Sequence, residues 1–269
     1  MTATAPRHRY DYEVDLEREV AGTKVVRFVG RGRRVLELGA GPGSIARILK
    51  ERNGCRITAI ENDPTALALL AQHCECVHQL DLNKAGWAGR VCDQGRFETI
   101  VAADVFEHLY DPWAVLREAK SALSDGGEIV VSLPHAGHNA VLACLAAGDF
   151  EYRDWGLLDR THIRFFGLHN IERLFMDSGL KIVEAEFVIT PPERTEFAER
   201  WRQTPAAFKE GLAFNHFGSV YQVVIKAKAD ADPQSGLRLS SLQTEPPPES
   251  ACRRFRRWLS RLARGGRHA

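Results

Sequence analysis

The sequence predicts an α/β fold: a doubly wound, mostly parallel sheet of seven strands, with helices on both faces and a helical insertion before the last strand. Two observations support this prediction. Short apolar segments alternate with segments of helical periodicity, and a glycine-rich turn joins the first strand to the helix after it. Strands connected through helices pair in parallel by right-handed crossovers. The carboxyl ends of such strands share one edge of the sheet, where ligands bind.

The expected elements follow from hydrophobic periodicity and turn residues. Residues 13–29 begin with acidic side chains and end with apolar ones, which predicts a short amphipathic helix before the sheet. Strands are expected at residues 33–38, 56–61, 76–80, 97–103, 127–133, 181–189 and 220–227. Helices are expected at residues 44–52, 64–72, 112–123, 139–147 and 168–178, and the helical insertion at 191–216.

The chain divides into four parts: an N-terminal cap segment and helix (1–30), the α/β domain (31–229), a linker (230–249) and a tail (250–269). The linker is rich in Pro, Ser, Gln and Asp, a composition that predicts disorder. The tail holds seven arginines and no acidic residue, and its apolar residues share one helical face. It is compatible with an inert end, a nucleic-acid contact or a helix on an anionic membrane. The amphipathic pattern favours peripheral membrane contact through residues 252–264.

The composition is that of a globular protein, with 44% hydrophobic residues and a formal net charge of +1. Outside the tail the chain is mildly acidic, so we expect no nucleic-acid partner. No apolar run approaches the roughly 18 residues that a membrane span needs. The first residues show no convincing signal or transit peptide. We therefore expect a cytoplasmic protein, with the inner face of the membrane as its contact if the tail binds lipid.

The cysteines give no sign of a disulfide framework or a metal site. There are six, and none forms a C-x-x-C pair. His73, Cys74, Cys76 and His78 lie close in the sequence, but their spacing matches no common structural zinc site. The sequence therefore predicts no metal.

The turn after the first strand reads Gly39-Ala40-Gly41-Pro42-Gly43. Glycines let the backbone approach a ligand closely, and the following helix offers unpaired N–H groups at its start. The pattern is G-x-G-x-G, which departs from the dinucleotide fingerprint G-x-G-x-x-G. Glu61, at the end of the second strand, is placed to accept hydrogen bonds from both hydroxyls of a ribose, although alone it fits a solvated strand-end carboxylate or a neighbour of a helix N-cap better. Together the two features predict a cofactor that contains a ribose.

Four further segments follow the glycine turn in a characteristic order. After VLELGAGPGS come TAIEND, QLDLN, FETIVAADVFEHLYDP and GGEIVVSLP. With these motifs, over roughly residues 30–135, the chain resembles the Rossmann-like class I S-adenosylmethionine-dependent methyltransferases. Within that class it resembles the branch of the ubiquinone-biosynthesis O-methyltransferases and the methyltransferases of glycan and sugar pathways. The resemblance is specific for the cofactor, S-adenosyl-L-methionine, and weak for the acceptor.

The resemblance implies a role for eleven positions. Glu37, Gly39, Ala40, Gly41 and Gly43 would line the methionine and ribose of the cofactor, and Glu61, beside Asn62, would bind the ribose. Asp81 and Leu82 would contact the adenine. Asp104 and Val105 would lie at the methionine end. Taken alone, Asp81 also fits a turn before the following asparagine, and Asp104 also fits a helix cap. The order of the motifs favours binding in both cases.

Methyl transfer to a hydroxyl depends on orientation and benefits from a nearby base, for which histidine is the first candidate. The candidates are His108, His135, His138 and His162. His162 is preferred because it lies beside Asp159 and Arg160 in an aromatic loop after the core strands. Asp159 would orient it. The alternative is a loop salt bridge with a packed histidine, and His108 likewise fits a packed residue at a helix start.

The acceptor site is expected to use Arg160 or Arg164 for an anionic group, His135, and Tyr12, which with Tyr10 would cover the cofactor. The predicted reaction is methyl transfer to a small-molecule or lipid-linked acceptor. Oxygen is favoured, on a quinone precursor, sugar or glycan; nitrogen is second. Two alternatives stay open: a nucleotide-dependent oxidoreductase, disfavoured by the glycine spacing, and a non-catalytic membrane- or partner-binding module with the same fold.

Overall fold

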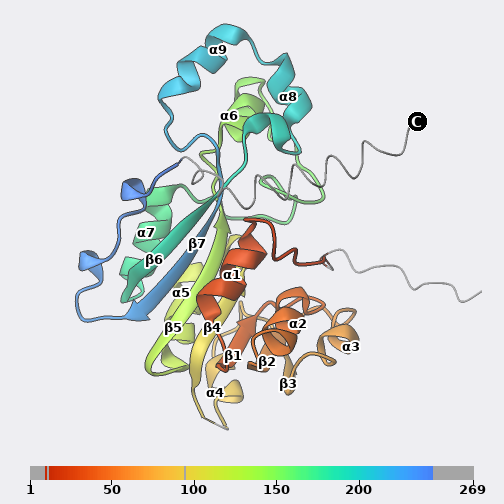
Figure 1. Cartoon of the computed structure of the whole chain (residues 1–269), viewed down its shortest axis with the longest axis vertical. Helices are drawn as coiled ribbons and strands as arrows, with labels where there is room; N and C mark the ends of the chain where they lie inside the picture. The colour runs from red at the N-terminus through yellow and green to blue at the C-terminus, as the bar shows by residue number, and fades with distance from the viewer. Residues whose placement is uncertain (1–9, 11, 94, 245–269) are drawn as a thin grey trace, which may run out of the picture.

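The computed structural model describes residues 10, 12–93 and 95–244. In this part a single sheet has the strand order β3-β2-β1-β4-β5-β7-β6 (Figure 1). The strands are β1 Arg34–Leu38, β2 Arg56–Glu61, β3 Cys76–Gln79, β4 Phe97–Ala103, β5 Leu123–Pro134, β6 Leu180–Ile189 and β7 Val220–Ala229. β1 to β5 are parallel, and β7 pairs antiparallel with both β5 and β6. The predicted seven-stranded, mostly parallel sheet is confirmed.

The order of the strands places a ligand site. From β1 the chain proceeds outward to β2 and β3, and then returns to the other side of β1 to form β4 and β5. The connections after β1 and β4 therefore diverge at the carboxyl ends of these two strands. Open parallel sheets bind ligands at such a switch point.

Helices cover both faces of the sheet. Side chains alternate between the two faces along each strand, so apolar side chains on both faces are available to pack against helices. α1 Ala21–Val29, α2 Ser44–Glu51 and α3 Leu67–Leu70 contribute to one hydrophobic core, with Val35 of β1. α4 Trp87–Val91, α5 Pro112–Ser121 and α7 Leu168–Asp177 contribute to the core on the opposite face, with Leu36 of β1. The helices on both faces are as predicted.

A third group of helices lies beyond the carboxyl ends of the strands, at the top of Figure 1. α6 Asn139–Ala146 follows β5, and the insertion before β7 consists of the short helices η2 Pro192–Arg194, α8 Ala198–Gln203, α9 Ala206–Gly211 and η3 Leu212–Phe214. A separate small core joins α6 to the first part of the insertion: Val141 of α6 and Phe197, which precedes α8, meet Leu157 and Leu158 of the intervening loop. The predicted helical insertion therefore packs on the loop that contains the preferred histidine. A single-turn helix, η1 Phe106–His108, follows β4.

Three helices differ from the prediction. The helix expected over 64–72 is only the four-residue α3. The N-terminal helix was expected over 13–29, but it begins only at Ala21. The Asp15 carboxylate accepts the Glu17 N–H, and the Asp15 carbonyl accepts the Thr23 hydroxyl. Such local bonds compete with helix formation. The five-residue α4 was not predicted, because it is too short to show a helical period.

The prediction of a disordered linker is wrong for residues 230–244, which are packed against the sheet. This segment forms two single-turn helices, η4 Pro233–Ser235 and η5 Leu239–Ser241. The Leu237 N–H donates to the Ile182 carbonyl of β6, and Leu239 is fully buried. Its polar composition conceals these apolar anchors. The remaining linker residues and the predicted membrane contact at 252–264 lie outside the described residues.

In the part of the chain that the structure describes, no helix is both long enough and apolar enough to cross a membrane.

Candidate functional site

A cavity of about 700 Å³ opens at the switch point, at the carboxyl ends of β1, β2, β3 and β4. Small-molecule sites usually have volumes of this order. Its walls come from the glycine turn, the strand ends, the N-terminal segment and the loop before α7. Of the sequence-predicted site residues, the lining includes Tyr12, Glu37, Gly39, Ala40, Gly41, Glu61, Asn62, Asp81, Leu82, Asp104, Val105, His108, Asp159 and His162.

The glycine turn is shaped by conformations that other residues rarely adopt. Gly39 and Gly41 have φ values of +59° and +53°. A Cβ on Gly39 would lie 3.0 Å from a methyl of Val105, so a side chain there is both strained and crowded. Gly43 is different, because it precedes α2 and faces Leu70 and not the cavity. A Cβ there would lie 3.2 Å from a methyl of Leu70, so Gly43 allows α2 and α3 to pack closely.

Glu61 at the end of β2 is held by the backbone around it. One carboxylate oxygen accepts the Gly41 N–H at 2.6 Å, and the other accepts the N–H groups of Asn62 and Asp63 at 2.7 Å each. A carboxylate offers about four acceptor positions, so capacity for a ligand hydroxyl remains. These bonds fix Glu61 at the glycine turn, the position that its sequence-based role requires.

Glu37 of β1 lies at the floor of the cavity and is 3% exposed. Its Oε2 has no hydrogen-bond partner within the described part of the chain. Burial, with the nearby charge of Glu61, raises the pKa of Glu37 to about 8. A buried acceptor without a partner is costly unless a ligand satisfies it. The ammonium group of S-adenosylmethionine has the charge and the hydrogens to do so, and the residues present fit this cofactor.

The two aspartates in the cavity differ in their contacts. Asp81 accepts the Asn83 N–H at 2.9 Å, so it forms the turn considered as an alternative and lines the cavity as well. Asp104 does not cap the following helix; its carboxylate accepts Ser132 Oγ at 2.9 Å and Gln222 Nε2 at 2.8 Å. Asp104 is open to the cavity, yet the protein around it desolvates the carboxylate and raises its pKa against these two hydrogen bonds.

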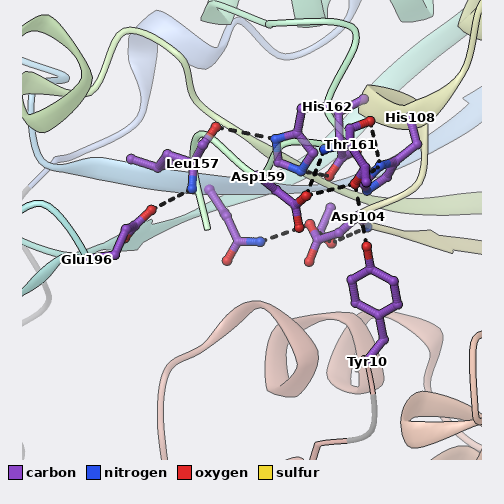
Figure 2. Close-up of polar contacts among 11 residues, drawn as sticks. Tyr10, Asp104, His108, Leu157, Asp159, Thr161, His162 and Glu196 are labelled. Atoms are coloured by element: carbon purple, nitrogen blue, oxygen red, sulfur yellow. Dashed lines mark hydrogen bonds and ion pairs between the residues drawn. The ribbon is translucent and has the colours of Figure 1, made fainter. Parts of the chain in front are cut away.

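Two histidines that line the cavity are in contact with each other. His108 of η1 and His162 of the loop lie edge to face, with ring centroids 4.8 Å apart (Figure 2). His162 Nδ1 lies 3.3 Å from the Leu157 carbonyl, and His108 Nδ1 lies 3.2 Å from the Thr161 carbonyl. Because a carbonyl only accepts, each Nδ1 donates in this arrangement. In the neutral form of each ring, Nε2 then carries the lone pair, which is the tautomer that a base or a metal ligand acting through Nε2 needs.

Asp159 is connected to His108 through a threonine. The Thr161 N–H and hydroxyl both donate to Asp159 Oδ1, at 2.9 and 2.8 Å, and His108 Nδ1 lies 3.1 Å from the same hydroxyl oxygen. The Tyr10 hydroxyl reaches this threonine at 3.5 Å from the N-terminal segment (Figure 2). Asp159 was expected to orient His162. These hydrogen bonds connect Asp159 through Thr161 to His108.

Three of the expected acceptor-site residues, Arg160, Arg164 and His135, are not among the residues that line the cavity. Arg160 forms an ion pair with Asp154 in an exposed turn, and the Arg164 guanidinium binds the Tyr110 carbonyl. The His135 ring is buried beside β7, with its Nδ1 3.2 Å from the Val220 carbonyl, and burial lowers its pKa. In each case a nearby partner holds the side chain away from the cavity.

His138, the remaining candidate base, also lies outside the cavity. Its Nδ1 accepts the Ala140 N–H at the start of α6, and Nε2 lies 2.8 Å from the Thr190 carbonyl. Burial lowers its pKa to about 4, so the ring is neutral and structural.

The cavity wall also includes residues that were not predicted as site residues, among them Glu107, Trp155, Thr161, Tyr221 and Gln222. Glu107 is adjacent to a candidate histidine, but nothing in the sequence distinguishes a buried glutamate from an exposed one. Tyr221 and Gln222 belong to β7, which enters the site only because it pairs with β5. That pairing joins residues about 90 positions apart and has no local signal.

Comparison with known proteins identifies the family. A family model described as "Methyltransferase domain" matches residues 8–185, well over half of the chain. The chain belongs to this methyltransferase family. The resemblance to class I S-adenosylmethionine-dependent methyltransferases, and with it the predicted cofactor, is confirmed. The match contains the glycine turn, all four strand ends at the cavity and both histidines.

The relatives differ in the atom that they methylate. A sarcosine/dimethylglycine N-methyltransferase of Halorhodospira halochloris is 28% identical over 152 residues, 55% of this chain and 50% of the relative. A ubiquinone biosynthesis O-methyltransferase of Bradyrhizobium sp. (strain ORS 278) is 25% identical over 172 residues, 63% of this chain and 65% of the relative. The chain thus spans between half and two thirds of the curated relatives that it matches.

A solved structure of a putative methyltransferase from Bacillus halodurans has the same fold. Its TM-score is 0.54 at 17% identity, over 78% of this chain and 99% of that one.

Proposed function

We propose that this protein transfers the methyl group of S-adenosylmethionine to an oxygen of a small-molecule or lipid-linked acceptor. A quinone precursor, a sugar or a glycan fits this description, and an amine is the second choice. The observation that carries the proposal is one continuous cavity with two unlike ends. Glu37 and Glu61 line it beside the glycine turn, and His108, Asp159 and His162 line it from η1 and the loop before α7.

The cofactor supplies an activated methyl group on a sulfonium, and the residues at the turn would hold it. Glu37 would bind the ammonium group, the Gly39–Gly41 backbone would follow the methionine, and Glu61 would accept the ribose hydroxyls. Asp81 and Leu82 would contact the adenine. Gly41 and Glu61 are already bonded to each other, which keeps this part of the site in one arrangement before a ligand binds.

At the other end, His162 or His108 would take the proton from the acceptor hydroxyl. The new bond joins the acceptor oxygen to the methyl carbon, and the electrons of the breaking carbon–sulfur bond stay on sulfur, which gives S-adenosylhomocysteine. The histidines would orient the oxygen in line with that bond, which accounts for much of the rate. Thr161 would connect Asp159 to His108, because its hydroxyl donates to the Asp159 carboxylate and lies within hydrogen-bond distance of His108 Nδ1.

Aromatic side chains support an apolar or lipid-linked acceptor. Trp155 lines the cavity and is 62% exposed. In the same loop Phe150 stacks on Tyr152 and contacts Phe165, and all three are exposed. Exposed apolar groups of this kind commonly mark ligand or membrane contacts. We propose that a hydrophobic part of the acceptor lies against this loop, and that residues 252–264 add peripheral contact with an anionic membrane.

Calorimetry with S-adenosylhomocysteine is the first test. We expect wild-type protein to bind it and Glu61→Ala to bind it more weakly, while Glu199→Ala, an exposed change in α8, binds as wild type does. A folded wild-type protein that does not bind S-adenosylhomocysteine contradicts the proposal. With an acceptor in hand, His162→Ala should lower kcat at saturating acceptor and leave the cofactor affinity nearly unchanged. Product analysis then separates O- from N-methylation.

A further inference from the structure

A buried carboxylate on the cavity wall has no hydrogen-bond partner. Glu107 is fully buried, and neither of its carboxylate oxygens forms a hydrogen bond within the described part of the chain. The His162 ring lies close to it, with Nε2 3.9 Å from Oε1. Burial raises the pKa of Glu107 well above its ordinary value, and the charges of Asp104 and Asp159 add to the effect. A group so placed is stabilised by a proton or by a bound cation.

Glu107 belongs to a compact group of three potential metal ligands. One atom from each of Glu107, His108 and His162 lies within 4.8 Å of the other two. An ion bound by all three side chains would lie about 2.0–2.2 Å from each ligand atom, as in zinc sites. Two imidazoles and one carboxylate are a donor set that binds divalent transition metals with open positions left for a ligand.

The histidines have the supporting contacts of metal ligands. In metal sites, the ring nitrogen that does not bind the metal donates to a backbone carbonyl or a carboxylate, which fixes the tautomer. His162 donates to the Leu157 carbonyl, and His108 donates to Thr161, which is bonded to Asp159. Leu157 is held in turn by the Glu196 carboxylate through its N–H at 2.6 Å (Figure 2). The rings are thus oriented before any ion arrives.

We propose that Glu107, His108 and His162 form a binding site for a divalent transition-metal ion in the wall of the cavity. The ion would bind the carboxylate of Glu107, whose oxygens form no hydrogen bond within the described residues, and one ring nitrogen of each histidine. Its role at the acceptor rests on the proposed function: a cation there would lower the pKa of an acceptor hydroxyl and position its oxygen. Binding of the ion does not rest on that function.

The test is metal binding to the full chain, measured without cofactor or acceptor. Protein treated with a chelator and then freed of it is titrated with Mn²⁺, and separately with Zn²⁺, by calorimetry. We expect one equivalent to bind to wild type, and Glu107→Gln to lower the affinity by about 10- to 100-fold. His108→Asn, at a half-buried position, should do the same. His169→Ala is the matched control, because His169 is exposed and also lies near a carboxylate, that of Glu172.

Two results would overturn the proposal: no binding by folded wild type, or equal affinity in wild type and Glu107→Gln. If zinc instead binds to the segment of His73, Cys74, Cys76 and His78, wild type and Glu107→Gln will have equal affinity for zinc, which is the second of these results. Titration with S-adenosylhomocysteine on the same samples checks folding and separates the two hypotheses. Cofactor binding without metal binding rejects the metal site alone, and metal binding without cofactor binding rejects the proposed function alone.

Discussion

At the scale of residues, the site depends on carboxylates that the protein keeps out of water. Glu37 illustrates the consequence for pH. Its folded-state pKa is raised from 4.5 to about 8, so the folded protein holds a proton that the unfolded chain releases at lower pH. The free energy of unfolding of the ligand-free protein should therefore decrease as pH rises through this interval.

Proton release on cofactor binding follows from the same shift. An ammonium group beside Glu37 favours its carboxylate form, so binding at pH 7 should release up to one proton from this residue. Calorimetry of S-adenosylhomocysteine in buffers with different ionisation enthalpies measures that number. Glu37→Gln should abolish the release and weaken binding. A wild-type protein that binds with no net proton release would show that Glu37 does not meet the ammonium.

Gly39 provides a test of the turn by backbone strain. With φ at +59° and a Cβ position 3.0 Å from Val105, Gly39→Ala should lower the free energy of unfolding by about 1–3 kcal/mol and weaken cofactor binding. Gly89→Ala is the matched control, since Gly89 lies in α4 with nothing within 4 Å of its Cβ position. There alanine should be neutral or slightly stabilising. Denaturant unfolding of both variants, each compared with wild type, decides the matter.

At this scale the sequence could predict those site residues whose positions depend on the local strand and turn pattern. Glu37, Gly39 and Glu61 line the cavity as expected because strand ends and the turn after β1 fix their positions. Arg160 and Arg164 do not, because a long, charged side chain takes the nearest partner, and that partner is a property of the fold. Glu107 was missed for the related reason that burial of a single acid leaves no mark in the sequence.

At the scale of elements, the insertion is connected to the loop that carries His162. Glu196, just before α8, accepts the Leu157 N–H at 2.6 Å with one oxygen and the Tyr221 hydroxyl at 3.0 Å with the other. Leu157 then accepts from His162. The helical insertion before β7 thus positions the His162 ring through two hydrogen bonds, one from the Leu157 N–H to Glu196 and one from His162 to the Leu157 carbonyl. Glu196 is therefore a positioning residue.

Glu196→Ala should lower kcat several-fold or more with little change in the affinity for S-adenosylhomocysteine, because the loop loses two bonds and the glycine turn loses none. Glu196→Gln can still accept the Leu157 N–H and should retain more activity, which a purely packing role would not predict. Glu199→Ala, two positions into α8 and exposed, serves as the control. Equal kcat in Glu196→Ala and wild type would remove this residue from the site.

The sequence predicted the strands better than the short helices for a physical reason. A buried strand such as β4 is apolar over its whole length, so its signal is strong. The five-residue α4 is too short to show a helical period and was not predicted, and the helix predicted over 64–72 is only the four-residue α3. The insertion was recognised as helical, but its packing over the loop depends on α6, more than 50 residues earlier in the chain.

At the scale of the whole molecule, the chain after β7 returns to cover the end of the sheet. β6 is an edge strand, and Leu237 donates to its Ile182 carbonyl at 2.8 Å. Glu172 of α7 accepts the Leu239 N–H at 2.6 Å. Covering an edge strand protects it from pairing with another chain. Composition predicted disorder here because it averages over many polar residues, whereas packing depends on a few leucines.

Leu239 allows this segment to be tested as a structural part of the domain. The side chain is fully buried against the core that includes α7, so Leu239→Ala should lower the free energy of unfolding by about 2–5 kcal/mol. Ser240→Ala, at the next and exposed position, should change it little. Because this segment lies at β6 and α7, away from the cavity wall, the folded Leu239→Ala protein should bind S-adenosylhomocysteine as wild type does. A loss of stability no larger than that of Ser240→Ala would mean that the segment is not packed in solution, and the disorder predicted from its composition would then be correct.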